Sequence, residues 1–311
     1  GNIFSCKAKA VVNATGVFTD NILSMDDPAA HKSVSVSQGI HLVLDKKFLP
    51  SASALMIPST TDGRVLFAVP WHDKIVVGTT DTPVTNPSLE PRPLEKEVEF
   101  VLENVSKYFL QVPSRADVLS VFAGLRPLAA PQKGKLKTKE ISRSHKIIIS
   151  ASNLFTILGG KWTTYRKMGE DMIDRVAKHL HWPQAGSSTK QLHIHGYDAN
   201  INYDDPFYFY GSDMVYVKEL MSNNAEWISE KLHIHEAHVI WAVKNEMART
   251  VEDVLSRRTR ALLLDARESI RIAPAVAEIM AHLMNKDNTW TDRQINNYTE
   301  LAKGYILNHS T

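Results

Sequence analysis

The chain has 311 residues, 43% of them hydrophobic, so it is long enough to bury a large core and to form one or two domains. Its 36 basic and 34 acidic residues give a net charge of +2, which provides no argument for nucleic acid as a partner. The single cysteine, Cys6, excludes intrachain disulfides and cysteine-based zinc sites, and no apolar run reaches the roughly 20 residues of a membrane span, so any membrane contact is expected to be peripheral.

The first 130 residues predict a mixed α and β structure in which strands dominate. The run "AVV" near the N-terminus predicts a strand, and residues 33–81 predict an antiparallel sheet from "SVSVSQGIHLVL", "GRVLFAVPW" and "KIVVGTTD". Residues 93–109 predict a helix, because their valines and leucine recur at helical spacing on one side. Residues 117–131 predict a further strand that ends in a proline-bounded loop.

A hairpin, a glycine turn and a helix are predicted between residues 146 and 180. The apolar run "NLFTIL" ends at Gly159 and Gly160, and apolar side chains then recur at helical spacing. A helix start of this kind aims free backbone N–H groups and the positive end of the helix dipole at something negative. The turn "GGKWTTYR" (159–166) is therefore a candidate binding site. The alternative is that the turn binds nothing and only connects a strand to a helix.

The composition changes at residues 181–200, which are rich in proline, glycine and serine and predict a linker. Beyond this linker the periodic segments are helical. Two of these helices are predicted to begin with capping boxes, one from Thr250 to Asp253 and the other from Asp265 to Glu268.

Polar side chains within the predicted strands are candidates for chemistry. His41, Arg126 and Arg143 lie in segments that otherwise favour apolar residues, and Lys161 follows the glycine turn. Two arginines and a lysine that flank one sheet could hold a phosphate, because arginine grips it with a bidentate fork and lysine with a point charge. The alternative for each cation is a solvated charge at the rim of the fold.

Two His-x-His pairs, His193 with His195 and His233 with His235, leave metal binding open by spacing, and His238 lies near the second pair. Neither pair is accompanied by cysteine or by paired acidic ligands, and the second lies in a helical region, so we predict that no metal is bound. The sequence also lacks a P-loop and a Gly-x-Gly-x-x-Gly dinucleotide fingerprint.

Six motifs together resemble the FAD-dependent glycerol-3-phosphate dehydrogenases of the quinone-linked, aerobic type, and their oxidase relatives. They are "AVVNATGVFTD", "GIHLVL", "PWHDKIVVGTTD", "AGLRPL", "GGKWTTYRKM" and "VEDVLSRRTRALLLDAR", in this order through nearly the whole chain. The resemblance covers the part of such enzymes that follows the N-terminal glycine-rich FAD-binding region. We therefore expect the chain to be a C-terminal portion that is inactive alone.

The resemblance implies an α/β plus α fold. Residues 1–186 are expected to form part of a FAD-binding domain of the glutathione-reductase-like type, together with a substrate domain built on an antiparallel sheet. Residues 187–311 are expected to form an all-α C-terminal domain.

The cofactor that the resemblance implies is FAD. The turn would lie against the isoalloxazine ring, with the helix start near N1 and the C2 carbonyl, where a positive dipole favours the reduced flavin. The turn residues are Gly159, Gly160, Lys161, Trp162 and Thr163. Ala14, Thr15 and Gly16 would pass close to the dinucleotide, where a larger side chain would obstruct it.

The substrate that the resemblance implies is sn-glycerol 3-phosphate, oxidised to dihydroxyacetone phosphate by hydride transfer to flavin N5. His41 is expected to be the base that takes the hydroxyl proton, or its hydrogen-bond partner, because imidazole titrates near working pH. Arg126 would lie beside the reacting oxygen and stabilise its developing charge. Arg143 and Lys161 are the phosphate candidates, and Lys161 could equally serve the flavin.

The electron acceptor implied is quinone, with O2 in an oxidase as the alternative, and the residues do not separate the two. The resemblance implies a cytoplasmic location, and it leaves open peripheral attachment to the inner face of the cell membrane and formation of a homodimer. A different class of function also stays open. In that case the chain is a non-catalytic interaction module, whose basic segment at residues 133–139 or "RRTR" helix binds a partner or an anionic membrane.

Overall fold

The computed structural model describes residues 3–130, 144–183, 185–222 and 226–307. The chain forms two compact units, each assembled from three separate segments. The first unit comprises Gly1–Gly39, Asp81–Pro91 and Gly124–His193, and the second comprises Ile40–Thr80, Arg92–Ala123 and Ile194–Thr311. No helix within the described ranges has the length and apolar character needed to cross a membrane.

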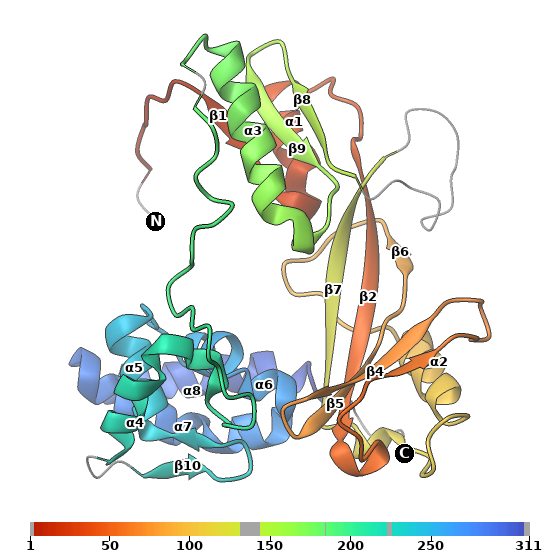
Figure 1. Ribbon diagram of the computed structural model, residues 1–311, viewed down its shortest axis with the longest axis vertical. Helices are drawn as coiled ribbons and strands as arrows, with labels where there is room; N and C mark the ends of the chain where they lie inside the picture. The colour runs from red at the N-terminus through yellow and green to blue at the C-terminus, as the bar shows by residue number, and fades with distance from the viewer. Residues whose placement is uncertain (1–2, 131–143, 184, 223–225, 308–311) are drawn as a thin grey trace. The chain divides into compact units, whose positions relative to one another are not determined.

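A three-stranded sheet in the order β1–β9–β8 forms the centre of the first unit (Figure 1). The short strand β1 (Val11–Asn13) runs parallel to β9 (Leu154–Leu158), and β9 pairs antiparallel with β8 (Lys146–Ile149). The predicted hairpin that leads into the glycine turn is therefore confirmed. The parallel pairing of β1 with β9 joins the two sequence regions that were expected to bind the cofactor.

Two helices cover this sheet. The helix α3 (Tyr165–His179) packs on one face, where Met172 and Val176, four residues apart, contact the fully buried Phe155 of β9. The helix α1 (Thr19–Asp26) lies on the other side of the sheet (Figure 1). The first unit thus has the layered α/β arrangement that the sequence predicts.

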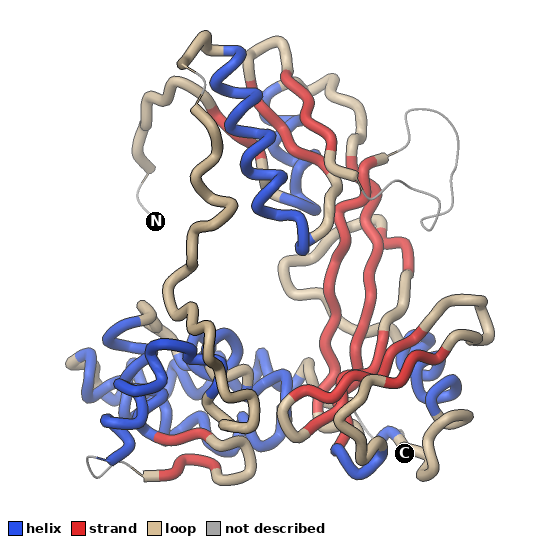
Figure 2. The backbone as a smooth tube through the Cα atoms, in the orientation of Figure 1, coloured by secondary structure: helices blue, strands red, loops and turns tan. Residues whose placement is uncertain are grey.

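A six-stranded sheet contributes strands to both units, and its long strands are visible in Figure 2. Its order is β3–β4–β5–β2–β6, and β7 also pairs with β2. The strands are β2 (Val34–Asp45), β3 (Leu55–Ile57), β4 (Leu66–Trp71), β5 (Lys74–Gly78), β6 (Thr82–Val84) and β7 (Ser120–Ala129). β2 pairs antiparallel with β5, which confirms the predicted antiparallel sheet, and the register places His41 opposite Gly78.

The helix α2 (Glu95–Val105) covers one face of this sheet within the second unit. Alternate residues of β2 meet the apolar side of the helix, as the period of two in a strand requires. The buried residues in this layer include Val98, Val101 and Val105 of the helix and Ile40, Leu42 and Leu44 of β2. The helix is also tied to the sheet by the Thr80 hydroxyl, which donates to Glu97 Oε1 at 2.8 Å and accepts from the Ile40 backbone N–H at 3.0 Å.

The C-terminal part of the second unit is helical, with one small hairpin. Its elements are α4 (Met214–Ser222), β10 (Trp227–Ser229), β11 (Ile234–His235), α5 (Glu236–Asn245), a π-helical turn (Asp253–Arg258), α6 (Ala261–Leu264), α7 (Ala266–Met284) and α8 (Asn288–Lys303). Short 3-10 turns in the chain are Gly16–Phe18, Lys46–Phe48, Arg115–Asp117, Trp162–Thr164 and Tyr208–Asp213. The fully buried Val276, Ala277 and Met280 of α7 belong to the core of this helical part.

The first predicted capping box is confirmed, and the second is half correct. The Asp253 N–H donates to Thr250 Oγ1 at 3.1 Å, and the Thr250 N–H donates to Asp253 Oδ2 at 3.0 Å. Asp265 Oδ1 likewise accepts from the Glu268 N–H at 3.0 Å. The Glu268 carboxylate does not return this bond, because it accepts instead from Ser229 Oγ and from Arg271.

Within the second unit the helical part is joined to the start of β7. The Ala266 N–H donates to the Leu119 carbonyl at 3.0 Å, and the Ser120 hydroxyl donates to the Leu262 carbonyl at 2.8 Å. These contacts place residues from both sides of the predicted boundary after residue 186 in one compact unit. A compact unit is defined by its internal contacts, whereas a domain is defined by its evolutionary origin. The division into domains at 1–186 and 187–311 therefore stays a prediction.

Candidate cofactor and substrate site

A cavity of about 830 Å³ lies within the first unit, which is a suitable size for part of a large ligand. It is bounded by the end of β1, by β7, by the end of β9 and by the first turns of α3. Of the residues predicted for the site, seven line this cavity: Ala14, Gly16, Arg126, Gly159, Gly160, Lys161 and Trp162. The structure therefore brings together segments more than 100 residues apart in the chain.

The turn between β9 and α3 requires glycine at both of its glycine positions. Gly159 and Gly160 have φ values of 66° and 87°, a region that L-residues with a side chain rarely adopt. A Cβ at Gly159 would also lie 3.0 Å from the Ser144 carbonyl oxygen. At the helix start, neither Lys161 nor Thr164 provides a side-chain cap. The Thr164 N–H donates to the Lys161 carbonyl at 3.0 Å and the Tyr165 N–H donates to the Trp162 carbonyl, so the backbone N–H groups that can meet a ligand are those of the turn before Thr164.

The loop after β1 is fixed by a buried asparagine. Asn13 Oδ1 accepts from Thr15 Oγ1 at 2.7 Å, and Asn13 Nδ2 donates to the Thr19 carbonyl at 3.1 Å. Gly16, with a φ of 62°, then turns the chain at the cavity wall. Thr15 does not line the cavity, and its hydroxyl is held by Asn13 of the same motif "NATG".

Arg126 extends from β7 into the cavity wall with a side chain that is 33% exposed. Its Nη1 lies 3.9 Å from Asp81 Oδ1, and the same carboxylate accepts a hydrogen bond from the Ser37 hydroxyl. Asp81 was not predicted from the sequence, although it belongs to the motif "KIVVGTTD". The two side chains form a loose ion pair in the wall of the cavity.

An exposed aromatic pair stands at the same cavity. Trp162 is 86% exposed and Tyr165 is 57% exposed, and their rings stack with centroids 5.5 Å apart. Large aromatic groups are rarely left so open unless they contact a ligand or another surface. Thr163, between them in the sequence, does not line the cavity.

His41 belongs to the second unit, so the structure does not group it with the cavity-lining residues. Its ring stacks on Phe122 of β7, with centroids 5.3 Å apart and an angle of 20° between the planes. Arg143 and the basic segment 133–139 lie outside the described residues. The roles predicted for His41 and Arg143 stay predictions.

The histidine pairs have structural partners. His195 Nε2 lies 2.7 Å from Asp213 Oδ2. His235 Nδ1 accepts from the Ala237 N–H, and His238 Nδ1 accepts from the His235 N–H, each at 3.2 Å, so the two rings cap the start of α5. These bonds account for the spacing of His235 and His238 without a metal.

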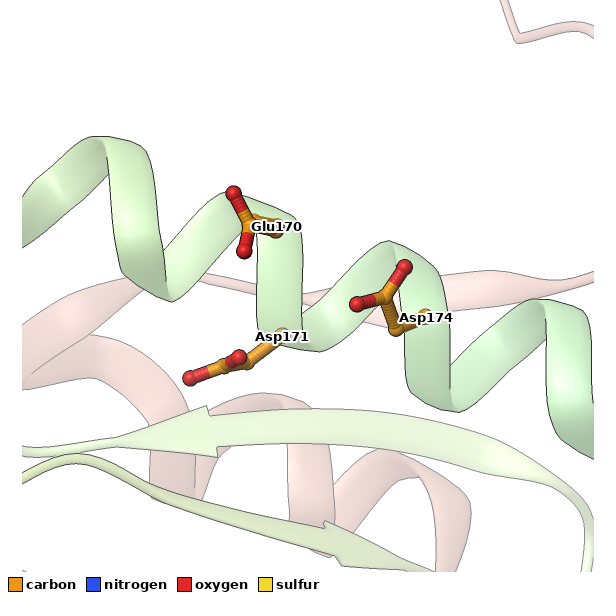
Figure 3. Close-up of side chains that lie close together, drawn as sticks. All are labelled: Glu170, Asp171 and Asp174. Atoms are coloured by element: carbon orange, nitrogen blue, oxygen red, sulfur yellow. The ribbon is translucent and has the colours of Figure 1, made fainter. Parts of the chain in front are cut away.

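Three carboxylates that the sequence analysis did not single out lie close together on α3: Glu170, Asp171 and Asp174 (Figure 3). Glu170 accepts from Lys167 Nζ at 2.8 Å and from Arg166 Nη1 at 2.5 Å, and these bonds lower its pKa to about 2. Asp171 lies 2.7 Å from Lys167 Nζ and 2.9 Å from His145 Nε2. Since neighbouring cations already occupy two of the carboxylates, the cluster gives no indication of a metal.

Comparison with known proteins supports the same fold. The sequence profile of the FAD dependent oxidoreductase family matches residues 1–165, and that of the C-terminal domain of alpha-glycerophosphate oxidase matches residues 156–292. A probable mitochondrial glycerol-3-phosphate dehydrogenase of Dictyostelium discoideum is 36% identical over 97% of this chain and 51% of its own length. The mitochondrial glycerol-3-phosphate dehydrogenase of Homo sapiens is 34% identical over 98% of this chain and 45% of its own length.

A solved structure gives the same result. The glycerol-3-phosphate dehydrogenase from Bacillus halodurans, complexed with FAD, superposes with a TM-score of 0.78 at 26% identity, over 98% of this chain and 64% of that protein. The chain belongs to the FAD-dependent oxidoreductase family, and its α/β unit, antiparallel sheet and helical C-terminal part have the expected fold. It spans about half the length of the Dictyostelium and human relatives.

Proposed function

We propose that this chain forms part of a FAD-dependent glycerol-3-phosphate dehydrogenase and contributes the flavin-side half of its site. The observation that carries the proposal is the convergence of the loop after β1, Arg126 and the Gly159–Gly160 turn on one cavity. The cavity fits a flavin, because backbone rather than side chains forms the wall at Gly16 and Gly159, and because no side chain caps the turn at residues 161–164 that leads into α3. Trp162 adds an aromatic surface for a planar ring.

The proposed reaction is the oxidation of sn-glycerol 3-phosphate at C2 to give dihydroxyacetone phosphate. FAD, when bound, supplies the acceptor for the hydride that leaves C2 with the electron pair of the C–H bond. The hydroxyl proton passes to a base. As it leaves, partial negative charge develops on the C2 oxygen, and this charge is lost when the carbonyl forms. Arg126 is proposed to stabilise this charge, since its guanidinium is a cation in the wall of the cavity and only loosely paired with Asp81, at 3.9 Å.

His41 is proposed to take the hydroxyl proton or to orient the group that takes it. Its imidazole is partly exposed and lies flat on Phe122, which fixes the ring plane. An imidazole held in this way is placed to accept a proton from a hydroxyl group beside it, which is the task of a general base. Lys161 and Arg143 are proposed to bind the substrate phosphate, and Lys161 lines the cavity beside the glycine turn.

Quinone is the proposed electron acceptor. Because quinones reside in the bilayer, this acceptor requires that the protein reach a membrane surface, and we propose a cytoplasmic protein attached peripherally to the inner face of the cell membrane. Oxygen is the second candidate acceptor, since the profile that matches residues 156–292 is named for an oxidase.

The proposal is tested on the complete enzyme of which this chain is proposed to form part, by adding sn-glycerol 3-phosphate anaerobically to that enzyme reconstituted with FAD. We expect the visible absorbance of the flavin to bleach with sn-glycerol 3-phosphate and to persist with sn-glycerol 1-phosphate. Equal bleaching by both isomers, or by neither, would contradict the proposed substrate. Re-oxidation by a soluble quinone without hydrogen peroxide supports the dehydrogenase, whereas stoichiometric hydrogen peroxide under air identifies the oxidase.

A further inference from the structure

A second cavity, of about 420 Å³, lies wholly within the second unit. Its walls include the turn between β4 and β5, where His72 and Asp73 are located, and the aromatic side chains of Tyr208 and Phe209. Nothing in the proposed oxidation of glycerol 3-phosphate uses these residues. Two polar groups in the walls nevertheless have weaker contacts than burial normally demands: one has only long contacts, and the other has no hydrogen-bond partner among the described residues.

Lys74 is the first of these groups. The residue is only 6% exposed and lines the cavity, yet the acceptors nearest to its Nζ are the Asp73 carbonyl at 3.5 Å and Asp73 Oδ2 at 3.6 Å. Both distances are longer than those of charge-assisted hydrogen bonds, and the Asp73 side chain is half exposed. A buried ammonium group is stable only with close hydrogen-bond acceptors. Lys74 can therefore bind an acceptor that lies closer than the two oxygens of Asp73.

His238 is the second group, and it is 1% exposed at the cavity wall. Its Nδ1 accepts a hydrogen bond from the His235 N–H, and burial lowers its pKa to about 3. The ring is therefore neutral with its proton on Nε2, which makes Nε2 a donor. This Nε2 has no hydrogen-bond partner among the described residues.

The charges around His72 favour an anion. Burial lowers the pKa of His72, and the positive charge of Arg260 lowers it further; Asp73 opposes this shift, and His233 and Lys74 add smaller effects that lower the pKa. Arg260 lines an adjoining cavity that shares Tyr203 and Phe209 with this one.

The carboxylates in the same walls are largely committed to other cations. Asp205 pairs with Lys218. Asp73 lies 3.6 Å from His233 and is half exposed, so it is the one carboxylate that competes with a ligand for Lys74, and Asp204 is exposed. Lys231, a further cation of the wall, pairs with Asp265.

We propose that this cavity is a second ligand site, which binds a small anion of the phosphate or carboxylate class through Lys74, His238 and His72. The Lys74 ammonium and His238 Nε2 are hydrogen-bond donors. A ligand that satisfies both must offer acceptor oxygens, as a phosphate or a carboxylate does. Tyr208 and Phe209 would contact a short apolar portion of the same ligand. The site takes a soluble anion rather than a lipid headgroup, since the cavity is small and buried groups form its floor.

The test uses inorganic phosphate as the probe and measures its dissociation constant by calorimetry at constant ionic strength. A local readout comes from NMR titration of His72, whose pKa rises when an anion binds beside it. Lys74→Met removes the ammonium but retains an apolar chain of similar size, and the Asp73 carboxylate that it leaves is half exposed, so water can solvate it. We expect phosphate to bind at this site about ten-fold more weakly or worse in Lys74→Met.

Two further variants control for folding and for general charge. Arg260 has a φ of 58°, a conformation that suits glycine, so Arg260→Gly removes the cation without strain and weakens phosphate binding. Lys47→Met removes an exposed lysine next to Lys46 that does not line the cavity, and it leaves binding unchanged.

Three results would overturn the proposal. The first is a His72 pKa that phosphate does not move, and the second is unchanged affinity in Lys74→Met. The third is binding to phosphatidylglycerol vesicles that Lys74→Met abolishes while free phosphate has no effect, which would assign the site to a lipid headgroup. Phosphate bound in the cavity of the first unit would survive Lys74→Met and leave His72 untouched, so the two sites are distinguishable.

Discussion

The ring of His41 occupies the space in which a side chain at position 78 would begin. The two residues are paired across β2 and β5, and a Cβ built on Gly78 would lie 2.5 Å from His41 Cδ2 and 2.7 Å from the Ile40 carbonyl oxygen. Glycine at position 78 is therefore what allows His41 to lie flat between the strand and Phe122.

Gly78→Ala is expected to displace the His41 ring and to lower both stability and kcat. Overpacking of this kind lowers the free energy of unfolding by about 1–3 kcal/mol. The measurements are denaturant unfolding and steady-state dye reduction by glycerol 3-phosphate. Gly124→Ala, in β7, is the matched control, because a Cβ there meets nothing within 4 Å. Normal kcat in a folded Gly78→Ala protein would remove His41 from the proposed chemistry.

Arg126→Lys is expected to lower kcat more than it changes KM. Lysine keeps the charge but loses the planar fork of the guanidinium, and the lost transition-state stabilisation is roughly 2–4 kcal/mol. Arg115→Lys is the control, since Arg115 pairs with Glu95 on the surface of the second unit. A raised KM with unchanged kcat would instead identify Arg126 as a residue that only holds the substrate.

Gly159→Ala is expected to weaken FAD binding. The substitution forces a side chain into a φ of 66° and brings its Cβ to 3.0 Å from the Ser144 carbonyl, so the turn must shift. Gly63→Ala provides the comparison, because Gly63 has a φ of 75° but open space around it. Both variants should lose about 1 kcal/mol of stability through backbone strain, and only Gly159→Ala should lose flavin during dialysis.

The stability of the fold is expected to fall at acid pH through His238. Its folded pKa of about 3 lies below its ordinary value of 6.5, so the unfolded chain binds the extra proton between these values. The stability is complete above about pH 6.5 and is lost toward pH 3, with a slope of up to about 1.4 kcal/mol per pH unit. Urea unfolding across this range should show a shallower slope in His238→Gln and no change in His31→Gln. Parallel profiles for all three proteins would mean that burial does not suppress protonation of His238.

Local signals in the sequence predicted the elements well, because short-range preferences decide them. Gly159 and Gly160 predicted a turn between β9 and α3, and Thr250 with Asp253 predicted a capped helix start. The second capping box was only half correct, since Glu268 bonds to Ser229, a residue 39 positions away. The spacing of residues along the chain cannot predict a hydrogen bond to a partner so far away in the sequence.

The candidate site could be predicted in part for the same reason. Gly16, Arg126 and Lys161 were selected from separate motifs, and the fold places all three at one cavity. Asp81 was missed, because its role depends on the pairing of β6 and β7 with β2 rather than on its own surroundings. The second cavity was missed as well, since His72, His238 and Lys74 meet only after the helical part packs within its unit.

The parallel pairing of β1 with β9 has a consequence for biosynthesis. Val11 pairs with Leu154, so a ribosome adds roughly 140 residues after β1 before its partner strand exists, which takes on the order of 10–30 s. During that interval the apolar side chains of Val11 and Val12 cannot pair with β9, whereas β4 and β5, separated by a two-residue turn, can form as they emerge. Co-translational folding should therefore begin with the antiparallel hairpin of the second unit, and the cavity at Gly16 and Gly159 should close last among the features of the first.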